Sequence, residues 1–159
     1  MLQLYKRIDN DLYYWITRDK DETTTIIHWG IVGERGKGKE FSIESFPDFR
    51  EIVQKEIDEK RADGYEEFDE DEMIFLEVEY ELEGFGSKND LLKRHRLEDY
   101  LTELLSSAGL GYADGGGIGS GTMAASCIVI DFDLAKKMIE DNLKNTEFSD
   151  YSLIYRMDG

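Results

Sequence analysis

Short runs of apolar and β-branched residues, separated by polar turns, predict a small antiparallel sheet at the start of the chain. The expected strands cover residues 2–8, 12–17 and 23–32, with polar turns at 10–11 and 19–22. Tyr13 and Trp15 are expected on one face of this sheet. Glycines and lysines then predict a loop at 33–39, and residues 40–42 predict a returning fourth strand.

A helical pattern follows the fourth strand. Its inward stripe consists of Phe49, Ile52, Val53 and Ile57. Ser45 and Asp48, three residues apart, resemble a capping box, Pro47 suits the first turn, and Gly64 suits the end of the helix. We expect this helix to cover one face of the sheet.

A charged run at residues 66–72 predicts a linker. We therefore expect one domain over residues 1–68 and an acidic α+β domain over 69–159. Residues 73–82 then predict a strand in which apolar and acidic side chains alternate. One face of this strand carries the carboxylates of Glu77, Glu79 and Glu81. This row is either a solvated sheet face or the surface of an acidic inhibitor.

An amphipathic helix is expected over residues 89–107. Asn89 or Asp90 is the expected cap, and Leu91 and Leu92 are expected among its inward side chains.

The last part of the chain predicts a strand, a helix and a strand. Residues 122–132 suit a buried central strand, because they are apolar at positions that face both sides. Asp131 or Asp133 caps a helix with Leu134 among its inward residues, and residues 151–157 form the last strand. This order suggests a ferredoxin-like split βαβ domain, an α+β sandwich with its helices on one face.

Several features of the first half together resemble the WGR domain, over about residues 1–68. They are Trp29-Gly30, Gly33, the 36–38 loop, Phe41, the helix with Phe49, and Lys60-Arg61 followed by Gly64-Tyr65. The family occurs beside the catalytic domain of poly(ADP-ribose) polymerases and in many bacterial proteins. The resemblance implies a small sheet with one helix, and a DNA contact near strand breaks through the Trp and Arg of the Trp-Gly-Arg motif.

The chain departs from this motif at one position, because it reads Trp29-Gly30-Ile31. A guanidinium can pair with phosphate and an isoleucine cannot. Arg35, Lys37 and Lys39 are nearby cations that could replace the arginine, with Trp29 stacking on a sugar or base. Alternatively, Trp29 packs in the core and the three cations are solvated loop charges.

Charge changes the expected partner. The chain carries a net charge of −17, of which residues 1–68 hold −5 and residues 69–159 hold −12. Such a field repels phosphate backbones and accelerates encounter with basic partners. We expect a protein partner, preferably a basic one, and nucleic acid is disfavoured. No apolar run is long enough for a membrane span and the start has no signal-peptide core, so we expect a cytosolic protein without a membrane partner.

Candidate chemistry is sparse. The single cysteine, Cys127, excludes an internal disulfide and any metal site with several cysteines. Because the chain has only two histidines besides, we expect no structural zinc site. Cys127 is interpreted as core packing. His95 has Asp99 at i+4 only as one option of a surface pair, and we assign it no chemistry. No spacing singles out an acid–base pair, a metal triad or a nucleophile elbow. We expect no enzyme activity, no metal and no cofactor.

The glycine run at residues 109–121 allows two interpretations. It is either a mobile loop or bulged hairpin rim, or a backbone nest that donates N–H groups to an anion. It lacks the Gly-Lys-Ser/Thr ending of a P-loop, and a β-rich run follows it in place of a helix. Tyr112 and Asp114 are its candidate binding side chains.

Two functions remain. The first is a non-catalytic bacterial adaptor whose WGR-like half binds DNA weakly or not at all. The second is an acidic inhibitor similar to toxin-neutralising immunity proteins, directed against a basic protein through Glu77, Glu79 and Glu81.

Overall fold

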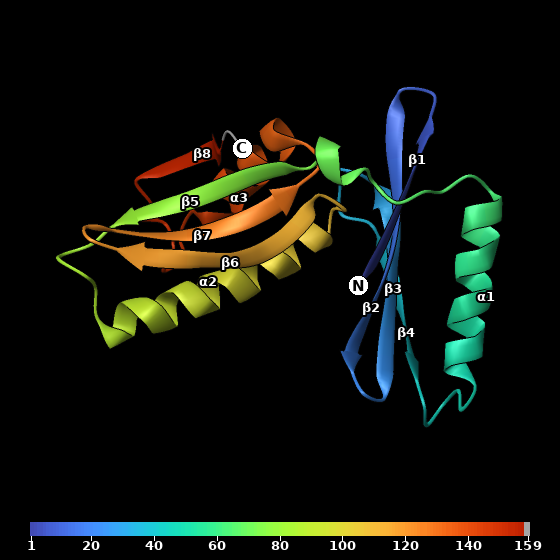
Figure 1. Cartoon of the computed structure of the whole chain (residues 1–159). Coiled ribbons are helices and arrows are strands. Elements are labelled where there is room, and N and C mark those ends of the chain that lie inside the picture. The colour runs from blue at the N-terminus through green and yellow to red at the C-terminus, as the bar shows by residue number, and fades with distance from the viewer. Residues whose placement is uncertain (158–159) are drawn as a thin grey trace. The chain divides into compact units, whose positions relative to one another are not determined.

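The computed structural model describes residues 1–157, and the chain divides into two compact units (Figure 1). The first unit comprises residues 1–69 together with 107–109. The second comprises residues 70–106 and the chain from 110 onward.

The first unit is a four-stranded sheet with one helix. Its elements are β1 (Leu2–Ile8), β2 (Asp11–Asp21), β3 (Thr24–Ile31), β4 (Lys37–Ser42) and α1 (Phe49–Ala62). The strands pair antiparallel in chain order. Alternate residues point to one face, and this face is buried by α1. The core consists of Leu4, Trp15, Ile27 and Phe41 from the strands, Phe49 and Val53 from the helix, and Tyr65. The expected sheet covered by a helix is confirmed.

Three boundaries in this unit differ from the prediction. Strand β2 continues to Asp21, so the predicted turn at 19–22 is mostly strand. The chain turns sharply after Asp21, because the Asp21 carboxylate accepts a hydrogen bond from the Thr23 backbone N–H at 2.8 Å. Strand β4 begins at Lys37, inside the predicted loop. Helix α1 has Asp48 as its N-cap, without a side-chain hydrogen bond. Ser45 is not the cap, because the helix begins only at Phe49, directly after Asp48.

The second unit is a four-stranded sheet with two helices. Its elements are a 3₁₀ turn at Glu70–Glu72, β5 (Ile74–Glu81), α2 (Lys88–Ser106), β6 (Gly111–Gly119), β7 (Thr122–Val129), α3 (Phe132–Leu143) and β8 (Leu153–Met157). The strand order is β6-β7-β5-β8, with every neighbouring pair antiparallel. Strands β5 and β6 are therefore parallel to one another with β7 between them, which is the ferredoxin-like split βαβ arrangement. The predicted α+β class is confirmed.

One face of this second sheet is covered and the other is open. Alternate residues of the two central strands are fully buried: Leu76, Val78 and Tyr80 on β5, and Met123, Ala125, Cys127 and Val129 on β7. Helices α2 and α3 contact one another. Their buried side chains are Leu97, Leu101, Leu104, Leu105, Ala135, Ile139 and Leu143. Strand β7 is central as expected, but only one of its faces is fully buried.

Some predicted helix positions are wrong. The cap of α2 is Ser87, whose hydroxyl accepts from the Asp90 backbone N–H at 3.2 Å while the Asp90 carboxylate accepts from the Ser87 N–H at 2.8 Å. This reciprocal capping box places the cap one residue before Lys88. Leu91 and Leu92 are 40% and 46% exposed, because the buried stripe of α2 starts only at Leu97.

Helix α3 begins as one of the two predicted alternatives. Asp131 is its N-cap, and the Asp131 carboxylate accepts a hydrogen bond from the Leu134 backbone N–H at 3.0 Å. The Leu134 side chain is 41% exposed and not inward, because it lies one position before the buried stripe that starts at Ala135.

The glycine run is mainly a strand. Strand β6 pairs with β7, and its register shifts between Ala113 and Gly116, which is a β-bulge. A Cβ on Gly116 would lie 2.2 Å from the Ala124 carbonyl oxygen, so only glycine allows this approach of the two strands. The bulged hairpin is the alternative that the structure adopts.

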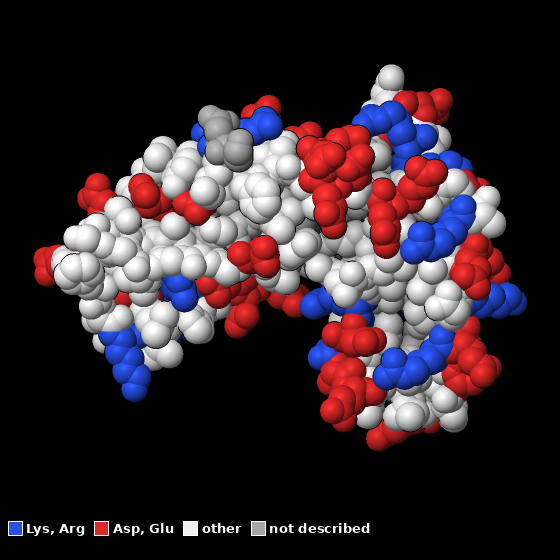
Figure 2. Space-filling view, in the orientation of Figure 1, with Lys and Arg blue, Asp and Glu red and all other residues white. Residues whose placement is uncertain are grey.

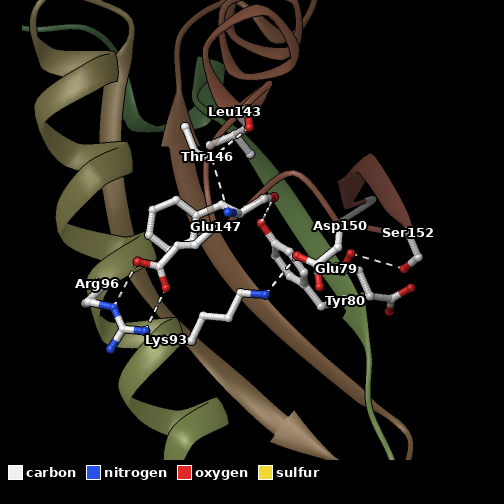
Figure 3. A network of polar contacts seen from close by, with 10 residues as sticks. Glu79, Tyr80, Lys93, Arg96, Leu143, Thr146, Glu147, Asp150 and Ser152 are labelled. Carbon is white, nitrogen blue, oxygen red and sulfur yellow. Dashed lines mark hydrogen bonds and ion pairs between the residues drawn. The ribbon is translucent and has the colours of Figure 1, made fainter.

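Polar contacts fasten the segment between α3 and β8 (Figure 3). From α2, Lys93 Nζ lies 2.8 Å from the Asp150 carboxylate and the Arg96 guanidinium contacts both carboxylate oxygens of Glu147. The buried Tyr80 hydroxyl donates to the Phe148 carbonyl at 2.8 Å. These contacts hold the chain reversal that delivers β8 to the edge of the sheet.

Candidate binding site

Trp29 lies near the end of β3, directly opposite Trp15 on β2. Both side chains point to the face that α1 covers, because the two residues are cross-strand partners. Trp15 is 3% exposed, whereas Trp29 is half-buried and packs against the core from its rim. Trp29 therefore has a structural role and offers only part of its ring to a partner.

Lys39 on β4 covers this ring. Its Nζ lies 5.7 Å from the Trp29 ring centroid and 5.3 Å from that of Phe41. The same ammonium group pairs with the Glu56 carboxylate of α1. The charge of Lys39 is thus shared between an aromatic face and a carboxylate, which leaves it a weaker partner for a phosphate.

Of the other two predicted cations, Lys37 lies directly opposite Trp29 on β4, and Arg35 lies in the turn before it. Arg35 and Lys37 are exposed in and beside the turn between β3 and β4. Their side chains form no ion pair within residues 1–157. Ile31, at the place of the motif arginine, is half-buried opposite Tyr13. The turn therefore brings two free cations near Trp29, and none at the motif position itself.

The opposite face of the sheet holds a polar pair that sequence reasoning missed. The Tyr14 hydroxyl donates to the Ser107 carbonyl at 2.9 Å and lies 2.9 Å from His28 Nδ1. Because a hydroxyl has one proton, its oxygen accepts a hydrogen bond from His28 Nδ1. A Cβ on Gly36 would lie 2.2 Å from the Tyr14 hydroxyl, so glycine makes room for this contact. The alternation of side chains along the two strands could have indicated this pair, since it places the rings of Tyr14 and His28 on the sheet face opposite to Trp15.

Burial shifts the titration of both groups. Desolvation raises the pKa of Tyr14 to about 12, against a smaller lowering by a hydrogen bond from the Gly36 backbone. Desolvation lowers the pKa of His28 below its usual 6.5, and the positive charge of Arg18 adds to this lowering. Both effects favour the neutral form of the His28 imidazole in the folded chain.

The fold and this site define the first unit as a small α+β module with a half-buried tryptophan beside a basic glycine turn. Residues 2–72 match the family model of the WGR domain, which confirms the expected resemblance over this segment. Comparison with curated proteins and with solved structures gave no match.

The acidic row predicted in the second half lies on the open face of its sheet. Glu77 is fixed there by two hydroxyls, because Tyr155 donates to Oε2 and Ser126 donates to Oε1 at 3.0 Å. The hydrogen bond to Glu77 is the main cause that raises the pKa of Tyr155 to about 12. Glu79 is half-buried and Glu81 is exposed. Glu77 thus has a structural role, and Glu79 and Glu81 are available to a partner.

The two candidate binding residues of the glycine run, Tyr112 and Asp114, lie in different surroundings. Tyr112 on β6 is half-buried opposite Ile128, on the open face of the sheet. Asp114 is exposed in the bulge. The structure therefore brings Tyr112 to the same face as the acidic row.

The described residues offer little else for chemistry. Cys127 is buried and free, and burial raises the pKa of its thiol to about 12. Across residues 1–157 we find no group of three His, Cys, Asp or Glu side chains placed to hold a metal ion. No helix in the same range has the length and apolarity to cross a membrane.

Proposed function

We propose that the chain is a non-catalytic binding protein, an adaptor whose WGR-like unit has weak or no affinity for DNA. The observation that carries this proposal is the half-buried Ile31 at the motif arginine position, opposite Tyr13. An apolar side chain there removes the bidentate phosphate contact. A bacterial origin and a cytosolic location belong to the same proposal.

Electrostatics supports weak DNA binding. Lys39 is paired with Glu56, so Arg35 and Lys37 are the free cations of the turn within residues 1–157. Each phosphate contact adds affinity through counterion release, and two contacts add little at physiological salt. The net charge of −17 opposes the approach of any duplex.

Fluorescence anisotropy with a nicked, 5′-phosphorylated duplex at about 0.15 M salt tests this proposal. We expect no sub-micromolar binding by the natural chain. The double variant Ile31→Arg, Glu56→Gln restores the arginine and frees Lys39, and we expect it to bind about 10-fold more tightly. The proposal would be overturned if the natural chain bound the duplex with sub-micromolar affinity and if Arg35→Ala and Lys37→Ala weakened this binding.

A second candidate is an immunity-type inhibitor of a basic protein toxin. It is favoured by Glu79 and Glu81, which lie on one face of β5 and form no ion pair within residues 1–157. Such an inhibitor forms a complex whose association rate falls steeply with salt. Titration of purified basic nucleases with the chain measures this directly, and activity that stays unchanged at low salt counts against an inhibitor of that class.

A further inference from the structure

The open face of the second sheet carries an apolar row that crosses all four strands. Phe75 on β5 pairs with Met157 on β8 and with Ile128 on β7, and Ile128 pairs with Tyr112 on β6. Side chains at directly paired positions lie about 5 Å apart and form one continuous strip. Phe75 is 47% exposed and Met157 is 42% exposed. Figure 2 shows a broad uncharged area over β5, β7 and β6.

Carboxylates border this strip. Glu77 and Glu79 follow Phe75 at alternate positions of β5, so all three side chains share the open face. Ser126 and Tyr155 donate hydrogen bonds to Glu77, which hold its carboxylate on this face. Within residues 1–157, no Lys, Arg or His lies at an open-face position of these four strands.

We propose that this open face binds a basic segment of another protein, one that places an apolar side chain next to a Lys or Arg. The inference rests on the proposed function of a non-catalytic binding protein and assigns it a second partner surface. The apolar strip around Phe75 supplies buried area, and Glu79 supplies the charge that selects a cation.

Charge also decides between occupants. A second copy of the chain would bring the anionic face against an equally anionic one, and the open-face strand positions within residues 1–157 carry no cation to compensate. A nucleic acid would bring phosphates towards Glu79 and Glu81. A basic protein segment meets neither penalty.

A labelled peptide that alternates Leu and Lys over about 10 residues is the probe, because alternation places its Leu side chains on one face of an extended strand. Two matched peptides, alternating Ser with Lys and Leu with Gln, remove the apolar side chains and the charge respectively. We expect the natural chain to bind the Leu–Lys probe at least 10-fold more tightly than either matched peptide, by fluorescence anisotropy.

Variants of the full chain locate the binding. Phe75→Ser removes the centre of the strip and is expected to weaken binding at least 10-fold, and Glu79→Gln about 3-fold, with the second effect lost at high salt. Phe85→Ser and Glu51→Gln are the matched controls, since Phe85 is 79% exposed outside the strands and Glu51 lies on α1. Both controls are expected to bind as the natural chain does.

Three results would overturn the inference. Equal weakening by Glu51→Gln and Glu79→Gln indicates general attraction to an acidic protein. Unchanged binding by Phe75→Ser, with the variant still folded by circular dichroism, places the probe elsewhere. Self-association that Phe75→Ser abolishes in sedimentation assigns the face to a second copy. Tight duplex binding in the anisotropy assay would contradict the weak-DNA proposal and leave the peptide result unaffected.

Discussion

Lys39 lies over the indole ring of Trp29, with its Nζ 5.7 Å from the ring centroid. The inner side of the Trp29 ring packs against the core of the first unit, and Lys39 covers part of its outer side. In this chain the tryptophan of the family signature therefore stabilises the fold of the first unit as well as marking a surface. Removing the ring therefore tests how much it contributes to stability.

Trp29→Ala is expected to lower the free energy of unfolding of the first unit by about 2 kcal/mol, because a half-buried ring is lost from the core. Trp15→Ala, which removes a ring that is 3% exposed, is expected to cost about 3–5 kcal/mol. Both tryptophans lie in the first unit, so the remaining one reports unfolding in urea by fluorescence. An unchanged midpoint for Trp29→Ala would show that the ring serves contact alone.

The stability of the first unit is expected to fall as the pH drops through about 6.5, because folding favours the neutral form of His28. The pKa of His28 is lower in the folded chain, so the unfolded chain binds more protons and the free energy of unfolding rises with pH in this window. Urea midpoints at about pH 7.5 and pH 5.5 measure the slope. His28→Gln should flatten it, and an equal slope in the variant would assign the pH dependence to other groups.

Gly116→Ala is expected to destabilise the second unit by about 1–3 kcal/mol, because its Cβ would lie 2.2 Å from the Ala124 carbonyl oxygen and force β6 away from β7. Gly117→Ala is the control next to it, since no atom lies within 4 Å of its added Cβ. The buried thiol of Cys127 reports on this unit alone, as it reacts with a thiol reagent only after opening. Similar labelling rates for the two variants would contradict the close approach of the strands.

Tyr80→Phe is expected to destabilise the second unit by about 1–2 kcal/mol, because the Phe148 carbonyl loses a buried hydrogen bond of 2.8 Å. Arg96→Ala removes the exposed pair with Glu147 in the same network and is expected to have a much smaller effect. Hydrogen exchange of the amides between α3 and β8 compares the two variants. Faster exchange in Arg96→Ala than in Tyr80→Phe would reverse this ranking.

Local alternation made most of the fold predictable. The pattern of residues 73–82 predicts a strand with one buried and one acidic face, and Asp131 and Asp133 are the two caps that the sequence offers for α3, of which the structure uses Asp131. Helix starts were less predictable, because several polar residues compete for the cap and packing decides between them. Ser45 had the spacing of a cap for α1, yet the helix begins only after Asp48.

The candidate site was predictable only in part, because its decisive contacts join distant segments. Trp29 and Lys39 could be named from the glycine-rich turn. The pairing of Lys39 with Glu56 depends on how α1 lies across the sheet. The strip around Phe75 depends on the strand order, since Ile128 and Met157 flank Phe75 from the two neighbouring strands, β7 and β8. No local pattern contains this information.

The bulge in β6 has a consequence for solubility. This strand lies at the edge of its sheet, and glycines such as Gly115 and Gly117 leave its backbone accessible. An uninterrupted edge of this kind is a template on which another chain can add a strand and start a fibril. The register shift between Ala113 and Gly116 interrupts that template, and Asp114 places a negative charge in the gap. By this reasoning the irregular glycine strand is a poorer template for strand addition than a regular edge strand would be.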